Sequence, residues 1–460
     1  MGFRCAAVDM RDVLDLAGWK LIGTRIDKGE TKDMLVFEAE YQHDPRGCTK
    51  CGSVSFYKHG IKKVKFTDSP MRGMHASIEA SARRYKCRDK DCGATFMQPL
   101  GGVLESPRMT ERCVKFIKDI CLKHSFIHVA KEIGVDEKTV RSIGRAKAIT
   151  VVEAHRPRLP RVLGIDETRI AKRLRVVFTD IERRKLLDMK DDRKQGVVEL
   201  WFSQFHDRSS VEVITMDMWR PYQRLSRRYF PRAVIVVDKF HILRMASEAM
   251  DRVRIRLART RPAEVGTSWK RSRHVLHKPY DKLTPSQKFN RDTWLDNEPE
   301  IRYALEAKDA FYGIYKLPKD EAAKAFDAYP DSLHPSIRKE FRRLVTAMRN
   351  WRTEILAFFD APHTNAYTES LNNLIKRIVK DGRGYSYDVL RARILAQYGD
   401  KLKEPLRIKH LIKDHNNPCD NCGCLCSAVD MTPVVLPPLL KGQKSKEALV
   451  CPGCAERFHT

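Results

Sequence analysis

Short apolar runs that end in acidic residues mark the central part of the chain as strand-rich. Residues 233–237 form a continuous apolar run before Asp238, which is typical of a strand in the middle of a buried sheet. Similar runs precede Asp166 and Asp217, so we predict that each of these acids ends a strand. A helical pattern at 221–229 separates two of the runs. Strands that alternate with helices favour an α/β layer.

A helical pattern over residues 109–147 precedes this layer. Gly134 permits a tight turn within it, Asp136 can cap the following helix, and Val140 can pack that helix back on the first. The pattern favours a helix-turn-helix, although an ordinary helical hairpin has the same spacing. In a helix-turn-helix the second helix would present groups suited to phosphates and base edges: Lys138, Thr139, Arg141, Ser142 and Arg145.

The second half of the chain is mostly helical. We predict a long basic helix over 240–261, and residues 262–355 look like a helical insertion rich in lysine, arginine and aromatic residues. A further helix over 364–380 has an apolar stripe at spacings of three and four residues. Glu369 lies off that stripe and is therefore available for chemistry.

Ten of the thirteen cysteines fall into two clusters with the spacing of metal ligands. The first reads Cys-x2-Cys-Gly and then Cys-x4-Cys-Gly, which predicts a zinc ribbon with four thiolate ligands, Cys48, Cys51, Cys87 and Cys92. The second predicts a C-terminal zinc-binding module with the ligands Cys419, Cys422, Cys451 and Cys454, while Cys424, Cys426 and His459 are extra or substitute ligands. The other three, Cys5, Cys113 and Cys121, are interpreted as ordinary reduced thiols.

The charge balance points to a polyanionic partner. The 460 residues contain 87 Lys+Arg against 59 Asp+Glu, a formal net charge of +28. A basic surface of this size attracts nucleic acid, whether specifically or not. Residues 1–20 lack the apolar core of a secretory signal, and no apolar run is long enough to cross a bilayer. We therefore expect a soluble cytoplasmic protein with no membrane partner.

Three carboxylates are candidates for a catalytic metal site. Asp166 and Asp217 come from strand ends, where ligand sites gather in α/β sheets, and Glu369 comes from a later helix. Three such acids can hold two Mg²⁺ or Mn²⁺ ions for phosphodiester displacement. Most acids are solvated surface groups, however, and Asp238 competes with Asp217 for the second position. His241 lies one helical turn beyond Asp238. Its alternative roles are structural support and contact with DNA.

Four sequence blocks carry a resemblance to a known family. They are Gly-Ile-Asp-Glu at 164–167, Met-Asp-Met-Trp-Arg-Pro-Tyr at 216–222, Val-Val-Asp-Lys-Phe-His-Ile at 236–242 and Thr-Asn-Ala-Tyr-Thr-Glu-Ser-Leu-Asn-Asn-Leu-Ile-Lys at 364–376. Together with the preceding ribbon and helix-turn-helix, this order resembles the bacterial insertion-sequence transposases of the DDE type.

The resemblance implies a multidomain α/β protein whose RNase H-like catalytic domain carries a helical insertion. It implies that Asp166, Asp217 and Glu369 are the catalytic acids and that Mg²⁺ or Mn²⁺ is the cofactor. The expected partners are the terminal inverted repeats of a mobile element, target DNA and further copies of the chain. The alternatives are a zinc-containing DNA-binding regulator derived from an inactive transposase, and a structure-specific nuclease.

The predicted domain boundaries follow from these motifs. They are an N-terminal segment at 1–44, the zinc ribbon at 45–100, the helix-turn-helix at 106–149, a linker at 150–161, the catalytic domain at 162–400 with its insertion at about 258–355, and the C-terminal module at 401–460.

Overall fold

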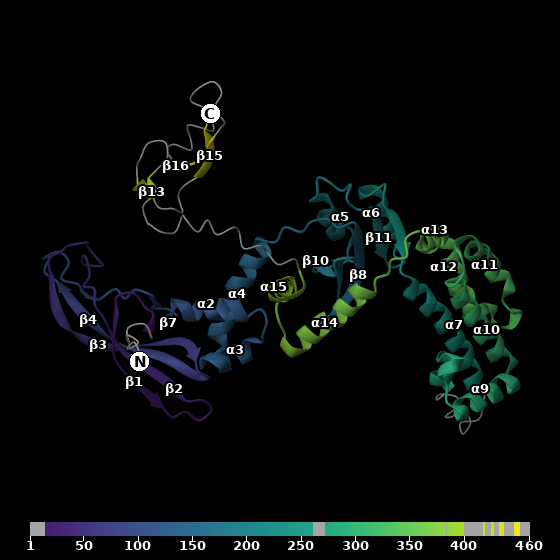
Figure 1. The fold of residues 1–460 in the computed structure, drawn as a ribbon, viewed down its shortest axis with the longest axis horizontal. Coiled ribbons are helices and arrows are strands. Elements are labelled where there is room, and N and C mark those ends of the chain that lie inside the picture. Colours follow the sequence, from purple (N-terminus) through teal and green to yellow (C-terminus); the bar gives the residue numbers. More distant parts are fainter. Residues whose placement is uncertain are drawn as a thin grey trace, which may run out of the picture. The chain divides into compact units, whose positions relative to one another are not determined.

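The computed structural model describes residues 14–260, 272–382 and 384–399, together with four short strands beyond residue 416 (Figure 1). The chain divides into two compact units, Met1–Asp400 and Lys401–Thr460. In the second unit, β13 (Asn417–Pro418) pairs with β14 (Leu425–Cys426), and β15 (Thr432–Leu436) pairs with β16 (Lys446–Val450). The predicted C-terminal ligands Cys419, Cys422, Cys451 and Cys454 lie outside the described residues.

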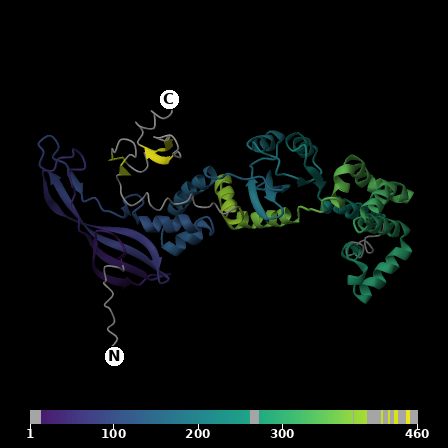
Figure 2. The same ribbon diagram turned by 45° about the horizontal axis from the view of Figure 1, so that its top comes forward.

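A seven-stranded sheet forms the first part of the larger unit. Its main path runs β1-β2-β4-β3-β7-β6, and β5 pairs with β4. The long antiparallel hairpin of β3 and β4 dominates it, as both ribbon views show (Figure 2). The strands are β1 (Trp19–Asp27), β2 (Met34–Tyr41), β3 (Phe56–Met71), β4 (Met74–Cys87), β5 (Thr95–Met97), β6 (Val103–Leu104) and β7 (Met109–Thr110).

This sheet joins regions that the sequence analysis had separated. Strand β2 lies parallel to β4, and Phe37 faces Ile78 across the pair. Phe37, Ile78 and Phe66 are all buried in one core. Residues 19–41 therefore belong to the same sheet as the cysteine-bearing hairpin, and the boundary at 44/45 falls within one folded body. The alternation of apolar residues predicts strands but does not say which strands pair.

Three helices follow the sheet: α2 (Glu111–Ile120), α3 (Phe126–Ile133) and α4 (Glu137–Glu153). Gly134 has φ of 82°, a left-handed conformation that ends α3 and favours glycine. Asp136 caps α4 by accepting a hydrogen bond of 2.6 Å from the amide of Lys138, as predicted. Helix α4 continues to Glu153, so the first residues of the predicted linker are helical.

A five-stranded sheet forms the centre of the larger unit, in the order β10-β9-β8-β11-β12. Strand β9 is antiparallel to both of its neighbours, β10 and β8, whereas β11 lies parallel to both β8 and β12. Three helices connect or follow the later strands. The elements are β8 (Val162–Ile170), β9 (Arg173–Asp180), β10 (Lys185–Met189), α5 (Gln195–Ser203), β11 (Val213–Met216), α6 (Arg220–Tyr229), β12 (Val234–Val237) and α7 (Lys239–Arg259).

The predicted helical insertion packs against α7 and shares its hydrophobic core with the central sheet. Figure 1 shows these helices grouped together in green. Phe311 and Phe341 are fully buried in the shared core. The elements are the 3-10 turn η1 (Tyr280–Lys282), α9 (Pro285–Asn297), α10 (Pro299–Ile314), α11 (Lys319–Ser332), η2 (Pro335–Ile337), α12 (Arg338–Asn350), α13 (Arg352–Leu356) and η3 (Ala357–Phe359). No helix among the described residues is both long and apolar enough to span a membrane.

The last two helices of this unit return to the central sheet. Helix α14 (Ala366–Gly382) packs on β8, and α15 (Tyr387–Tyr398) packs on β10 and α4. Arg391 makes two hydrogen bonds, 2.8 and 3.0 Å long, to the buried carboxylate of Asp188 on β10. Arg393 donates to the carbonyls of Cys121 and His124 beside α3. The apolar side chains of α2–α4 and of α14–α15 therefore form one core.

Candidate active site and zinc centre

The register of the central sheet brings Asp166 and Asp217 together. Strand β8 continues through Ile170, so Asp166 lies inside a strand and the prediction that it ends one was wrong. The antiparallel partner β9 extends β8 beyond the end of the apolar run. Strand β11 pairs with β8 only as far as Met216 opposite Ile165. Asp217 therefore follows β11 at the level of Asp166, and its charge contributes to a raised pKa of Asp166.

Helix α14 delivers Glu369 to the same edge of the sheet. The buried side chain of Asn365, just before the helix, accepts a hydrogen bond of 2.5 Å from Thr215 and donates one of 3.0 Å to the carbonyl of Ile165. Thr368 and Thr179 share a buried hydrogen bond of 2.7 Å between their hydroxyls. These bonds join the start of α14 to three strands, so the position of Glu369 is determined by the sheet.

Gly164 on β8 makes this close approach possible. A Cβ atom at that position would lie 2.5 Å from Cδ1 of Ile181 and 3.0 Å from Oγ1 of Thr368, and closer still to Oγ1 of Thr179. Contacts below 3.0 Å require a neighbouring atom to move. The glycine in the sequence block at 164–167 is therefore explained by the close packing of Thr179, Ile181 and, on α14, Thr368 against β8.

His241 and Asp238 complete the cluster from the start of α7. Asp238 caps the helix by accepting a hydrogen bond of 3.3 Å from the amide of Phe240. Nδ1 of His241 contacts the Asp217 carboxylate, and its Nε2 lies 3.7 Å from Oε1 of Glu369. Ligand atoms of Asp238, His241 and Glu369 all lie within 4.8 Å of one another and could hold a metal ion.

Burial and mutual repulsion perturb the protonation of this cluster. Burial, followed by the charge of Asp217, raises the pKa of Asp166 to about 7. Burial also raises the pKa of Asp238 to about 6. For His241, burial alone lowers the pKa, but the hydrogen bond and charge of Asp217 outweigh it, and the net pKa is raised. Several acids confined in a partly buried site favour a bound cation, because a cation compensates their repulsion.

The residues present fit a hard divalent cation. They offer carboxylate oxygens, which Mg²⁺ and Mn²⁺ prefer, together with one imidazole. Oδ2 of Asp238 is buried and has no hydrogen-bond partner among the described residues. An acceptor of this kind is costly to leave unpaired, and a cation would satisfy it.

Asn372 is a site residue that the sequence analysis did not identify. Its buried side chain donates a hydrogen bond of 2.8 Å from Nδ2 to Oδ2 of Asp166. Asn372 is three residues from Glu369, so both side chains lie on the same face of α14. This spacing could have identified Asn372 from the sequence. Glu167, the neighbour of Asp166, instead makes hydrogen bonds of 2.8 and 3.0 Å with Arg193.

The first cysteine cluster has the geometry of a tetrahedral zinc site. The sulfurs of Cys48 and Cys92 are 3.8 Å apart, and those of Cys51 and Cys87 are 3.7 Å apart. All four sulfurs lie within 4.8 Å of one another. Sulfurs at about 2.3 Å from a tetrahedral ion are separated by roughly 3.8 Å. The backbone amides of Cys51 and Lys50 lower the pKa of the Cys48 thiol to about 7, which favours the thiolate that zinc requires.

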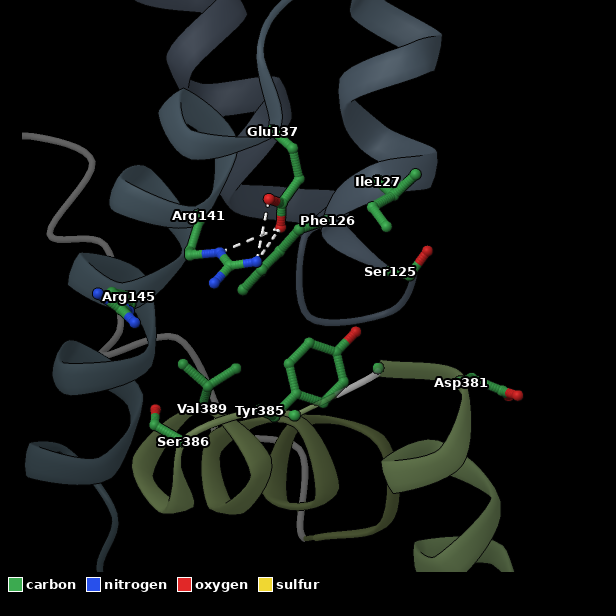
Figure 3. Close-up of a pocket in the computed structure, with 12 residues that line it drawn as sticks. Ser125, Phe126, Ile127, Glu137, Arg141, Arg145, Asp381, Tyr385, Ser386 and Val389 are labelled. Carbon is green, nitrogen blue, oxygen red and sulfur yellow. Dashed lines mark hydrogen bonds and ion pairs between the residues drawn. The ribbon is translucent and has the colours of Figure 1, made fainter.

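The five predicted DNA-binding residues of α4 differ in their surroundings. Lys138, Arg141, Ser142 and Arg145 are exposed, and Thr139 is half-buried. Arg141 forms an ion pair with Glu137, one turn earlier, at 2.7 Å. Figure 3 shows this pair beside a cavity of about 60 Å³ that Arg145 and Tyr385 also line. Lys138 and Ser142 lie outside that cavity.

Comparisons with known proteins identify the family of two parts of the chain. A family profile described as "Transposase", for DDE transposases of the ISL3 type, matches residues 163–394 and therefore includes all the acids of the cluster. A second profile, described as the zinc-finger of the transposases IS204/IS1001/IS1096/IS1165, matches residues 44–92 and includes the four sulfurs.

A curated relative also aligns along most of the chain. The transposase for insertion sequence element IS1001 of Bordetella parapertussis is 24% identical over 349 residues, which cover 74% of this chain and 85% of the relative. The sequence-based resemblance is thereby confirmed, and the zinc ribbon profile together with the cysteine geometry supports zinc as a ligand. The chain belongs to the ISL3 family of DDE transposases, with an N-terminal zinc ribbon.

Proposed function

We propose that this DNA transposase cuts and joins DNA at a divalent-metal site formed by Asp166, Asp217 and Glu369. One observation carries the proposal: acids from β8, from the end of β11 and from α14 converge on one edge of the sheet, although the chain separates the first and last by about two hundred residues. Acids that are ordinary surface groups do not usually cluster in a buried site, and the raised pKa of Asp166 is typical of a functional site.

The central domain is proposed to be RNase H-like. Three antiparallel strands followed by two parallel ones, with α7 after the last strand, support this assignment. The helical insertion between α7 and α14 fits the same interpretation. The proposed catalytic domain covers residues 162–400, with the insertion at about 258–355.

The roles of the individual side chains follow from their contacts. A pair of divalent cations, when bound, activates the attacking oxygen and stabilises the leaving oxygen of the phosphodiester. Asp166, Asp217 and Glu369 would hold them. Asn372 restrains the Asp166 carboxylate through its hydrogen bond. His241 lies against Asp217 and restrains it in the same way, or it replaces a carboxylate as a ligand.

Asp238 remains the competitor of Asp217 for the second position. Asp238, His241 and Glu369 have the mutual distances of a metal site. Asp238, however, is also committed to capping α7. We retain Asp217 because it is less buried than Asp238 and contributes more to the pKa shift of Asp166. Separate Asp217→Asn and Asp238→Asn variants test the choice. Cleavage that survives the first substitution and not the second would reverse it.

DNA recognition is assigned to the N-terminal half. The zinc ribbon and a helix-turn-helix formed by α3 and α4 would bind the terminal inverted repeats, with α4 presenting Lys138, Thr139, Arg141, Ser142 and Arg145. We propose domain ranges of 45–100 for the ribbon, extended by the paired strands of residues 19–41, and 106–149 for the helix-turn-helix. The enzyme would act as a homo-oligomer, since two element ends must be held together. The C-terminal cysteines at 401–460 are proposed to bind a second zinc ion.

The decisive experiment is cleavage of a labelled DNA fragment that carries the element's own ends, with Mg²⁺ or Mn²⁺. We expect cutting at the element end by the wild type and its loss in Asp166→Asn, with DNA binding retained in both. Strand transfer of pre-cut ends distinguishes a transposase from a nuclease of the same fold. Specific binding without cutting under either metal would instead favour a DNA-binding regulator.

A further inference from the structure

A groove opens directly beside the acidic cluster. It has a volume of about 380 Å³ and lies between helix α12 and the residues that follow β11. Met218 is the next residue after Asp217, and Met245 is one helical turn beyond His241, so the groove begins where the cluster ends. We call this feature the α12 groove; it is lined by Met218, Met245, Arg342, Arg343, Thr346, Ala347, Asn350 and Trp351.

The two walls of the α12 groove are fixed relative to each other. Arg220, at the start of α6, donates a hydrogen bond of 2.8 Å to the carbonyl of Asn350, and its guanidinium lies 4.6 Å above the Trp351 ring. Gln223 and Arg227, also on α6, both donate to the buried carboxylate of Glu354 on α13. The end of α12 is therefore tied to the helix that follows Asp217, and the groove is preorganised for a ligand.

The charges in the α12 groove are complementary to a polyanion. Arg342 and Arg343 are exposed, and neither forms an ion pair with an acid anywhere in the described part of the chain. By contrast, Arg256 on α7 and Arg352 on α13 do pair with carboxylates. Guanidinium groups suit phosphate oxygens because they offer several donors in one plane. The half-buried side chains of Met218 and Met245 offer apolar contact to a sugar or a base.

We propose that the α12 groove binds the DNA strand that carries the scissile phosphodiester, with Arg342 and Arg343 contacting phosphates next to the one at the acids. The proposal rests on the catalytic site proposed above. It gives the helical insertion a specific task, which is to position the strand for the reaction rather than to increase overall affinity. Misplacement of the reacting phosphate by about 1 Å can lower the rate by about a hundredfold.

Crosslinking tests where the strand lies without requiring any cleavage. In the full-length Asp166→Asn protein, p-benzoylphenylalanine is introduced at Thr346 in the groove and, as a control, at Lys324 on the exposed surface of α11. The probe is duplex DNA that carries the element end. We expect crosslinks from position 346 within a few nucleotides of the cleavage site and none from position 324.

Charge reversal tests the contribution to the reaction. Arg342→Glu and Arg343→Glu are compared with Lys324→Glu, which changes the net charge equally and lies outside the groove. We expect each arginine substitution to lower the cleavage rate at least about tenfold while affinity for the DNA end falls less than about threefold. We expect Lys324→Glu to keep both the rate and the affinity.

The outcomes separate this inference from the catalytic proposal. Normal cleavage by both arginine variants would overturn the role of the α12 groove and leave the catalytic site intact. The same conclusion would follow if the wild type cleaves but position 346 gives no crosslink near the scissile site. Crosslinks at that site in a protein that never cuts would support the groove and refute the catalytic proposal. Equal losses of affinity and rate would also overturn the inference, since the arginines would then act through general DNA binding.

Discussion

Gly164→Ala tests whether the packing of α14 against β8 sets the position of Glu369. The new methyl group would meet the Thr179 hydroxyl, Cδ1 of Ile181 at 2.5 Å and the Thr368 hydroxyl at 3.0 Å. Ordinary contacts begin at 3.4 Å, so Thr179 and Ile181 must move by roughly 1 Å and Thr368, on α14, by roughly 0.4 Å. The buried hydrogen bond between the two threonines is the contact most directly disturbed.

Two effects of different size follow from that displacement. Overpacking a core position costs about 1–3 kcal/mol, and loss of the threonine hydrogen bond contributes roughly a further 1 kcal/mol. A shift of Glu369 by roughly 0.4 Å relative to Asp166 would lower the cleavage rate by roughly sixfold, since a misplacement of about 1 Å costs about a hundredfold. The catalytic loss should therefore persist under conditions in which the variant is still fully folded.

The assay combines urea denaturation with single-turnover cleavage of the element end. Gly196→Ala is a matched control, because a Cβ at that position on α5 meets no atom within 4 Å. We expect this control to keep its rate and to gain about 0.5–1 kcal/mol of stability. A Gly164→Ala protein that is folded and cuts at the wild-type rate would refute the idea that α14 needs this close approach.

Three further predictions concern separate parts of the molecule. Asn372→Ala should lower cleavage about tenfold, because Asp166 loses its hydrogen-bond donor, whereas Ala at the exposed neighbour Asn373 should have no effect in the same assay. Cys48→Ser should reduce the zinc content of the purified protein by one ion per chain, as measured by metal analysis. Asp188→Asn should cost about 3–5 kcal/mol at pH 7 in urea denaturation, since it leaves the Arg391 guanidinium without its partner. Burial alone raises the pKa of Asp188, but the bonds and charge of Arg391 outweigh it and lower the net pKa. The stabilisation is therefore present above about pH 4 and is lost as the pH falls through the lowered pKa that Asp188 has in the folded protein. The difference in the free energy of unfolding between wild type and Asp188→Asn should shrink over the same pH range.

Features of this protein that depend on local spacing could be predicted from short stretches of the chain. The two cysteine knuckles predict their own zinc site, because each pair of ligands is fixed by a short turn that ends in glycine. Gly134 and Asp136 determine where α3 ends and α4 begins for a similar reason, since the left-handed turn and the cap are local contacts. The family, too, was recognisable from short blocks that keep their order.

Contacts between residues that are far apart in the chain became visible only in the folded molecule. Strand β2 joins the sheet of the ribbon because Phe37 is buried against Ile78, a pairing that alternation alone cannot specify. Asp166 lies within a strand because β9 extends the pairing past the apolar run. The hydrogen bond from Asn372 to Asp166 joins residues that are more than two hundred positions apart. Such contacts arise from register and packing, which depend on the whole sheet and on the helix that crosses it, and not on any one segment.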